Sequence, residues 1–287
     1  MPGMNAEVAD RLIDRVKTLP PAPRIVSELL GLLRQEDVPV DRIVELITFD
    51  PALTSKVLRR CNSAAFGGSE PVHNLSEAVA RVGFNDVYRL VAAVVGDSLL
   101  EAPQRGYGIA AGELWHHSVT AALAARVTAA AAGIDENIAF TAALLHDIGK
   151  LVLSDLLERA YDAVMQETSS SGHSFLEAEQ ILLGSDHAEI GGRLLERWNF
   201  PDNLVHAVRH HHDPRAATPH EHLAACVHVS DVIAHCLGEA HGYQAFAVRV
   251  QGEALELLEI TATELDGLTL ESALAVKKAA WLLPNSP

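Results

Sequence analysis

The chain is poor in cysteine and has no long apolar run. Its three cysteines, Cys61, Cys226 and Cys236, are far apart and form no CxxC pair. A disulfide framework and a thiolate zinc module are therefore both unsupported, and a reducing cytoplasm is the expected location. The longest weakly polar stretch, residues 119–134, is mostly alanine and carries Arg126, so it is too short and too weakly apolar to span a bilayer. The charged N-terminal residues show no secretory signal.

Basic residues are also scarce. The 287 residues include 22 Lys and Arg against 38 Asp and Glu, a formal net charge of −16. Nucleic-acid backbones and anionic membranes select basic patches, so we expect neither as a partner. Hydrophobic residues at 48% and charged residues at 21% are ordinary for a globular chain, which excludes disorder for most of it.

Histidine, in contrast, is abundant. The chain has 15 histidines, and eight of them lie between His206 and His235.

The apolar residues recur with a helical period along nearly the whole chain, which predicts an all-α fold. Frequent prolines and caps before residue 103 predict about five short helices in a first lobe, residues 18–104. After a seam at residues 103–108 the predicted helices are longer, and they form a second lobe, residues 105–240. They include single helices over 136–145, 149–168 and 201–212, the last of which ends in His211 and His212. Residues 241–287 are expected to form a helical extension.

The sharpest local feature is the pair His146-Asp147 in the sequence ALLHDIGK. An apolar helix that ends in an imidazole and a carboxylate, just before Gly149, presents two kinds of metal ligand at one point. The alternative is an ordinary helix end, where the histidine interacts with the helix dipole and the aspartate faces solvent.

Other potential ligands favour the first interpretation. Glu113 and His117 are four residues apart and share a helix face, and Asp231 lies among apolar neighbours, where an unpaired carboxylate is costly. Ligation by nitrogen and oxygen without thiolate suits Fe, Mn or Zn, and the number of ligands is enough for two ions bridged by Asp147. The candidate metal ligands are Glu113, His117, His146, Asp147, His187, His211, His212 and Asp231.

The remaining histidines are weaker candidates for metal ligands. His206 and His210 are four apart and could form a separate pair, but they are expected at the surface or beside the ligands. His228 and His235 share the face of Asp231, so either could touch the site, whereas His116 points away from His117. Three more are expected in solvent: His220, His222 and His241.

Several multi-residue motifs occur together and in order. LWHHS, HDIGK, DHAEIGGRLLERWNFP, HHHDP and HVSDVIA resemble the HD-domain superfamily. The earlier segments LPPAPRIVSELLGLL, IVELITFDPALTSKVLRRCNSAAFG and LSEAVARVGFNDVYRLV resemble the N-terminal part of the HDOD domain. The resemblance covers residues 18–238 and implies that the second lobe is an HD-type helical bundle.

The resemblance also implies roles for individual residues. His117, the pair His146-Asp147 and Asp231 match the ligands of catalytic HD proteins. Lys150 matches the basic residue after the signature pair, which would lie near substrate phosphate and act with Asp147 in catalysis. The related HD-GYP phosphodiesterases add histidine ligands that match His187, His211 and His212, and some of them also use a glutamate that matches Glu113.

Two functions follow from this resemblance. HDOD proteins are mostly signalling modules with degraded metal sites, whereas this chain keeps the whole ligand set. The favoured hypothesis is a cytoplasmic regulatory protein that binds two metal ions, with Fe or Mn preferred and Zn acceptable, together with a nucleotide or phosphate ligand and other signalling proteins. The alternative is a metal-dependent phosphohydrolase that uses a metal-bridging hydroxide. The sequence after His212 lacks the Gly-Tyr-Pro motif, which makes specific cyclic-dinucleotide hydrolysis doubtful.

Overall fold

The computed structural model describes residues 2–15, 24–33, 40–48, 51–62, 72–169, 173–239, 242 and 250–279. Within these residues there is no strand, only an isolated bridge between Gln104 and Ile109. The predicted all-α fold is therefore confirmed. The α-helices are α1 (Pro2–Arg15), α2 (Arg24–Leu33), α3 (Val40–Thr48), α4 (Pro51–Cys61), α5 (Leu75–Val82), α6 (Phe84–Leu100), α7 (Glu113–Ala132), α8 (Glu136–Leu145), α9 (Lys150–Arg159), α10 (Tyr161–Ser169), α11 (Phe175–Leu183), α12 (His187–Arg197), α13 (Asp202–Arg209), α14 (Glu221–Cys236), α15 (Gly252–Leu257) and α16 (Ala262–Lys278), with 3-10 turns η2 (Arg105–Tyr107) and η3 (Pro214–Ala217).

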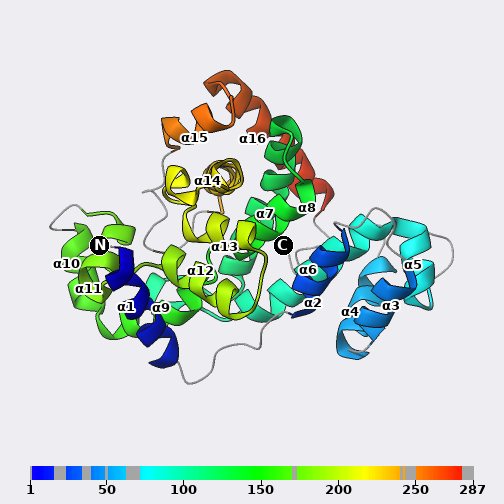
Figure 1. Cartoon of the computed structure of the whole chain (residues 1–287), viewed down its shortest axis with the longest axis horizontal. Coiled ribbons are helices and arrows are strands. Elements are labelled where there is room, and N and C mark those ends of the chain that lie inside the picture. Colours follow the sequence, from blue (N-terminus) through cyan, green and yellow to red (C-terminus); the bar gives the residue numbers. More distant parts are fainter. Residues whose placement is uncertain are drawn as a thin grey trace.

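The helices form two groups joined by α6 (Figure 1). Helices α2, α4 and α5 contact α6, and α3 packs against these three helices. Helix α6 also contacts α7 and α8. Helices α7, α8, α13 and α14 pack together at the centre, and α15 and α16 cover α14 and α7. Helix α1 packs against α12 and α9 instead of the first group, with ion pairs from Arg197 to Asp10 and Asp14. The division into lobes at residues 104 and 240 stays a prediction.

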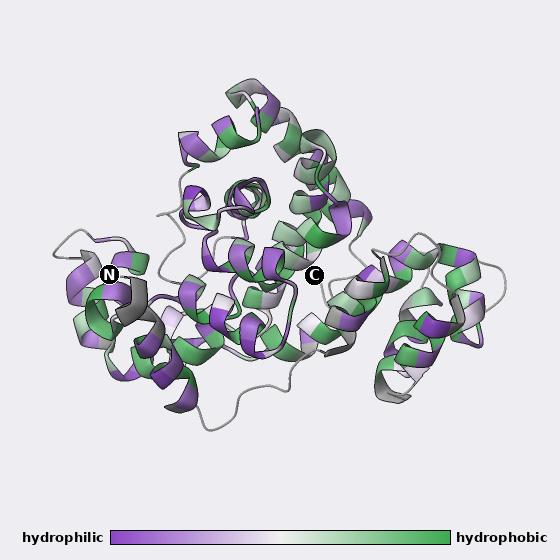
Figure 2. Cartoon of the chain, viewed as in Figure 1, coloured by the Kyte–Doolittle hydropathy of each residue, from purple (hydrophilic) through white to green (hydrophobic). Residues whose placement is uncertain are grey.

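Helix α7 forms the centre of the second group because most of its surface is apolar and small. Its run of alanines lets α8, α14 and α16 approach closely, and Trp115, 1% exposed, fills the space beside α6. Most other helices are amphipathic, with hydrophobic and hydrophilic residues on different faces (Figure 2). No described helix is long and apolar enough to cross a membrane.

Side-chain caps define where some helices of the second group begin. The Asp135 carboxylate accepts the backbone N–H groups of Asn137 and Ile138 at the start of α8. Ser174 and Glu177 form a capping box on α11, and Asp186 caps α12 through the N–H of Glu189. These caps satisfy N–H groups that have no partner within the helix, so each helix begins at a defined residue.

Two of the predicted helices differ from the structure. The predicted helix over 149–168 is divided into α9 and α10 at Ala160, where no glycine or proline marks the break. The predicted helix over 201–212 ends early, because α13 stops at Arg209 and His210 caps its C-terminus. His211 and His212 therefore lie in a turn, where the directions of their side chains are not set by the helical repeat.

Candidate metal centre

Seven of the eight predicted ligands lie close together in the core of the second group. His117 is in the first turns of α7, His146 caps the end of α8, and His187 is the first residue of α12. Six of the seven are at most 5% exposed, and His212 is half-buried. Side chains that could hold a metal form three groups whose ligand atoms lie within 4.8 Å of one another: His117, His146 and Asp147; His117, Asp231 and His235; and His187, His211 and His212.

The first part of the centre surrounds His117. Its Nε2 atom lies 3.3 Å from Nε2 of His146 and 3.1 Å from Oδ1 of Asp231. Nε2 of His146 is in turn 3.6 Å from the same Asp231 oxygen and 3.5 Å from Oδ2 of Asp147. Two imidazoles and two carboxylates thus face one point from α7, α8 and α14.

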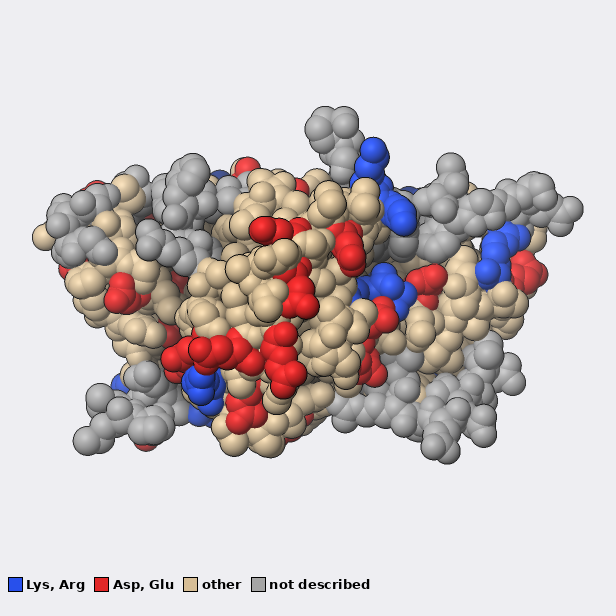
Figure 3. All heavy atoms as spheres, turned by 90° about the horizontal axis from the view of Figure 1, so that it is seen from above, with Lys and Arg blue, Asp and Glu red and all other residues tan. Residues whose placement is uncertain are grey.

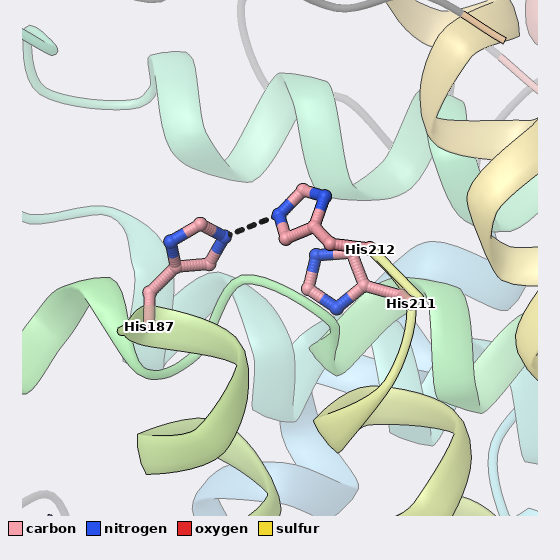
Figure 4. Close-up of side chains that lie close together, drawn as sticks. All are labelled: His187, His211 and His212. Carbon is pink, nitrogen blue, oxygen red and sulfur yellow. Dashed lines mark hydrogen bonds between the residues drawn. The ribbon is translucent and has the colours of Figure 1, made fainter. Parts of the chain in front are cut away.

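The second part is a group of three histidines (Figure 4). Nε2 of His187 and Nε2 of His212 are 2.8 Å apart, and the ring of His211 lies beside both. Asp147 connects the two parts, because its Oδ1 lies 3.4 Å from His187 while its Oδ2 faces His146. One carboxylate thus presents a different oxygen to each group, which is the arrangement required of a ligand that bridges two ions.

Three of these imidazoles are oriented by hydrogen bonds at Nδ1, the ring nitrogen opposite Nε2. The Nδ1 atoms of His117, His146 and His211 lie 2.7–2.9 Å from the backbone oxygens of Glu239, Ala143 and Val208 respectively. A carbonyl oxygen only accepts, so each Nδ1 carries the proton, and in the neutral ring Nε2 keeps a lone pair. Nε2 of His211 is buried and has no hydrogen-bond partner, which is costly unless a cation occupies the site.

Glu179 is a candidate functional residue that the sequence interpretation missed. Its carboxylate accepts the backbone N–H and Nδ1–H of His187 at 2.8 Å, and the hydroxyl of Tyr107 at 2.7 Å. Glu179 is completely buried, and a carboxylate behind a histidine ligand fixes its tautomer and raises its basicity. The signal was present in the sequence, since Glu179 shares the buried face of α11 with Phe175 and Ala178.

Lys150 also reaches the centre. Its Nζ lies 2.5 Å from Oδ2 of Asp147 and 5.6 Å from the centre of the Tyr107 ring, and the side chain is buried. Burial alone would raise the pKa of Asp147, but Lys150 and the adjacent histidines outweigh it and hold that pKa well below its usual value. Asp147 is therefore ionised and available as a ligand.

The histidines differ in their affinity for protons. Burial, reinforced by neighbouring imidazoles, holds the pKa values of His211 and His212 well below the usual value, so both are neutral. Burial also opposes protonation of His187 and His146, but the carboxylates beside them raise both pKa values. The second part of the centre thus combines the neutral imidazoles of His211 and His212 with that of His187, whose pKa Glu179 raises.

Close backbone contact brings Asp147 and His187 together. A Cβ atom on Gly149 would lie 1.9 Å from the backbone oxygen of His187 and 2.8 Å from the backbone nitrogen of Gly191. Glycine at residue 149 therefore allows the turn after Asp147 to touch the first turn of α12, and no other residue fits without moving a helix.

The remaining candidates are placed differently. Glu113 lines the same small cavity as His117, but its carboxylate accepts the N–H of Ala110 at 2.7 Å and it belongs to none of the three groups. His235 does touch the centre, 3.4 Å from Oδ1 of Asp231. His228 does not: its Nδ1 faces the backbone oxygen of His211, and its Nε2 accepts the N–H of Gln251. Of the three histidines expected in solvent, His222 is exposed, His220 is half-buried, and His241 lies outside the described residues.

The cavity beside the centre is small. Its volume is about 10 Å³, and its lining includes His117, Asp147, Lys150 and His235. A single water needs at least about this much space.

Fold and site together define an all-α protein with a buried cluster of histidine and aspartate side chains that could hold a metal. The HDOD domain model matches residues 19–214, and the chain belongs to the HDOD family. An HDOD domain protein of unknown function from Geobacter sulfurreducens has the same fold, with a TM-score of 0.72, 23% identity and coverage of 98% of this chain and 95% of that one. A candidate phosphohydrolase from Shewanella amazonensis also has a TM-score of 0.72, with 26% identity over 98% of both chains.

Curated relatives match over smaller shares of their length. An uncharacterized protein of Treponema pallidum is 28% identical over 224 residues, which cover 77% of this chain and 43% of that protein. Ribonuclease Y of Thermus thermophilus is 35% identical over 98 residues, which cover 34% of this chain and 12% of the enzyme. The chain therefore spans less than half the length of these relatives.

Proposed function

We propose that this HDOD protein is a cytoplasmic signalling protein that binds two divalent transition-metal ions between α7, α8, α12, α13 and α14. The bridging placement of Asp147 carries the proposal, since its two oxygens face separate groups of histidines at 3.4 and 3.5 Å. One ion would be held by His117, His146, Asp147 and Asp231, with His235 in reach, and the other by Asp147, His187, His211 and His212.

The residues present fit such ions. The donors are imidazole nitrogens and carboxylate oxygens, which suit Fe, Mn and Zn, and we favour Fe or Mn. The buried, unpartnered Nε2 of His211 and the three backbone contacts at Nδ1 leave lone pairs directed inward. When bound, divalent ions would neutralise the buried carboxylates and attract an anionic ligand such as a phosphate or nucleotide.

The proposal is tested by metal analysis of the full chain after reconstitution with Fe, Mn or Zn. We expect two equivalents in the wild type and at least one fewer in Asp147→Ala. The matched control is Asp155→Ala, which removes an exposed aspartate from α9 and should leave the metal content unchanged. Less than one equivalent in the folded wild type would overturn the proposal.

The small cavity favours a regulatory role over turnover in the conformation described. A nucleotide would have to displace side chains that line the cavity, among them His235, Glu239 and Leu114. We therefore propose that ligand binding and metal occupancy change the surface offered to other signalling proteins.

A metal-dependent phosphohydrolase is the second candidate. Lys150 lies against Asp147, where a cation could offset charge on a phosphoryl group, and the Shewanella amazonensis structure is described as a candidate phosphohydrolase. Bound ions would supply an activated water and polarise the phosphoryl oxygens. Hydrolysis of phosphomonoesters, nucleotides and cyclic dinucleotides by the wild type, abolished in Asp147→Ala, would establish this function, and no turnover of any of them would exclude it for these substrates.

Charge bears on the choice of partner. Figure 3 shows one face of the molecule, on which acidic side chains outnumber the basic ones among the described residues. Together with the net charge of −16, this supports our proposal that neither nucleic acid nor an anionic membrane is the main partner. Weak salt-dependent retention on heparin would agree with the proposal, and tight retention would contradict it.

A further inference from the structure

The turn that carries His211 and His212 is held from outside by the segment that follows α14. Helix α13 ends at Arg209, so the helical repeat does not orient these two candidate ligands. Gln251, the residue before α15, donates its side-chain N–H to the backbone oxygen of His212 at 2.8 Å. One side chain thus fixes the peptide group of a residue in the second part of the metal centre.

A second connection runs through His228. Its Nδ1 lies 2.9 Å from the backbone oxygen of His211, and because a carbonyl oxygen only accepts, Nδ1 carries the proton. Its Nε2 accepts the backbone N–H of Gln251 at 3.1 Å, so the ring is neutral. His228 is only 2% exposed, which leaves the ring little freedom to turn. Gln251 therefore reaches the backbone oxygens of both ligands, that of His212 directly and that of His211 through one imidazole.

Packing and ion pairs hold α15 beside this turn. Ala254 is completely buried, and α15 contacts both α14 and η3. Arg215, in η3 just after the turn, contacts Glu253 at 3.0 Å and Glu256 at 2.9 Å. Exposed ion pairs each contribute little, so the buried contact with α14 matters more. Together these contacts place Gln251 at a defined position relative to the turn.

From these contacts we infer that Gln251 is a positioning residue for the second part of the metal centre, acting on His211 and His212 through their backbone oxygens. The inference rests on the proposed metal-binding function. It extends that function to the C-terminal part of the chain, because the family model ends at residue 214. The coupling is reciprocal, since an ion bound by the two histidines would restrain the turn and thereby the start of α15.

Cobalt alone is the probe, titrated into the metal-free full chain and followed by the absorption bands of the bound ion. Gln251→Ala removes the contact with His212 and should weaken one of the two ions by about 3- to 10-fold, the equivalent of one hydrogen bond. Gln251→Pro also removes the N–H donor, so we expect a larger loss. The φ of −83° at residue 251 is close to the value that proline requires. The bands of the weakened ion should shift, which a role confined to the stability of α15 would not cause.

The matched control is Gln166→Ala, which removes an exposed glutamine from α10 and should bind cobalt as the wild type does. Gln251 is itself exposed, and Gln251→Ala gives the test alone if circular dichroism shows that Gln251→Pro is unfolded. Equal affinity and unchanged bands in the wild type and the folded Gln251 variants would overturn the inference and leave the proposed metal centre intact. A wild type that binds no cobalt would instead overturn the proposed function, and the inference with it.

Discussion

Glu179 accepts hydrogen bonds from both the backbone N–H and the Nδ1–H of His187, each at 2.8 Å. The carboxylate therefore fixes the ring of His187 and also supports the start of α12. We predict that Glu179→Gln keeps the fold but lowers metal affinity by roughly 10- to 100-fold, the usual effect of losing such a partner. The measurement is competition for zinc or manganese against a chromophoric chelator.

Glu177→Gln is the control on the same helix. Glu177 is exposed and belongs to the capping box of α11, so its loss should lower the melting temperature slightly without changing metal affinity. If both variants bind metal as the wild type does, Glu179 has only a structural role.

Lys150 lies where its ammonium group would compete with a metal ion for Oδ2 of Asp147. We predict that Lys150→Met leaves the bound metal at the wild-type level, because the ammonium group contributes no ligand and its removal frees that oxygen. The same change should weaken binding of inorganic phosphate to the metal-loaded protein, since a positive charge is lost beside the ions. Metal analysis and phosphate titration calorimetry measure the two effects, and a large loss of metal would show that Lys150 holds the site together.

Gly149→Ala is predicted to destabilise the protein severely. The added Cβ would lie 1.9 Å from the backbone oxygen of His187, which no side-chain movement can relieve. We expect a loss of at least about 3 kcal/mol in the free energy of unfolding, or failure to fold. By contrast, Gly267→Ala in α16 meets nothing within 4 Å and should stabilise the helix by up to about 1 kcal/mol. Urea denaturation of both variants provides the comparison.

The three cysteines should react very differently with thiol reagents. Burial raises the pKa of Cys61 to about 11 and that of Cys226 to about 12, so both thiols stay protonated at about pH 8. Cys236 is exposed. We therefore expect a single reactive thiol in the native protein and three in denaturant, and Cys236→Ser should abolish the native reaction. Rapid reaction of two or more thiols in the native state would contradict the packing around Cys61 and Cys226.

Much of the second group could be predicted from local pattern. The predicted helix over 136–145 matches α8, because Asp135 is a good cap and most of the residues after Asn137 are apolar. The break of α9 from α10 at Ala160 was not predicted, since no residue there disfavours a helix. The end of α13 at Arg209 was missed for the same reason, although it determines where His211 and His212 point.

Candidate ligands could be identified from the sequence because histidine and buried carboxylate are rare among apolar residues. Their partners could not be identified in the same way. Glu179 contacts His187 only because α11 packs beside the start of α12, and His220 meets Asp202 only because the segment between α13 and α14 folds back. Such contacts depend on how helices cross, which the period of a single helix does not encode.

The sequence by itself determined the all-α class, the family and the chemical types of the ligands, because these depend on periodicity and on residue identity along the chain. Only the tertiary structure decided that Asp147 faces two groups of imidazoles, that Glu113 stands outside them and that His235 lies within reach. The physical reason is that a metal centre requires atoms a few ångströms apart. That proximity is produced by close backbone packing, as at Gly149 and His187, between segments distant in the chain.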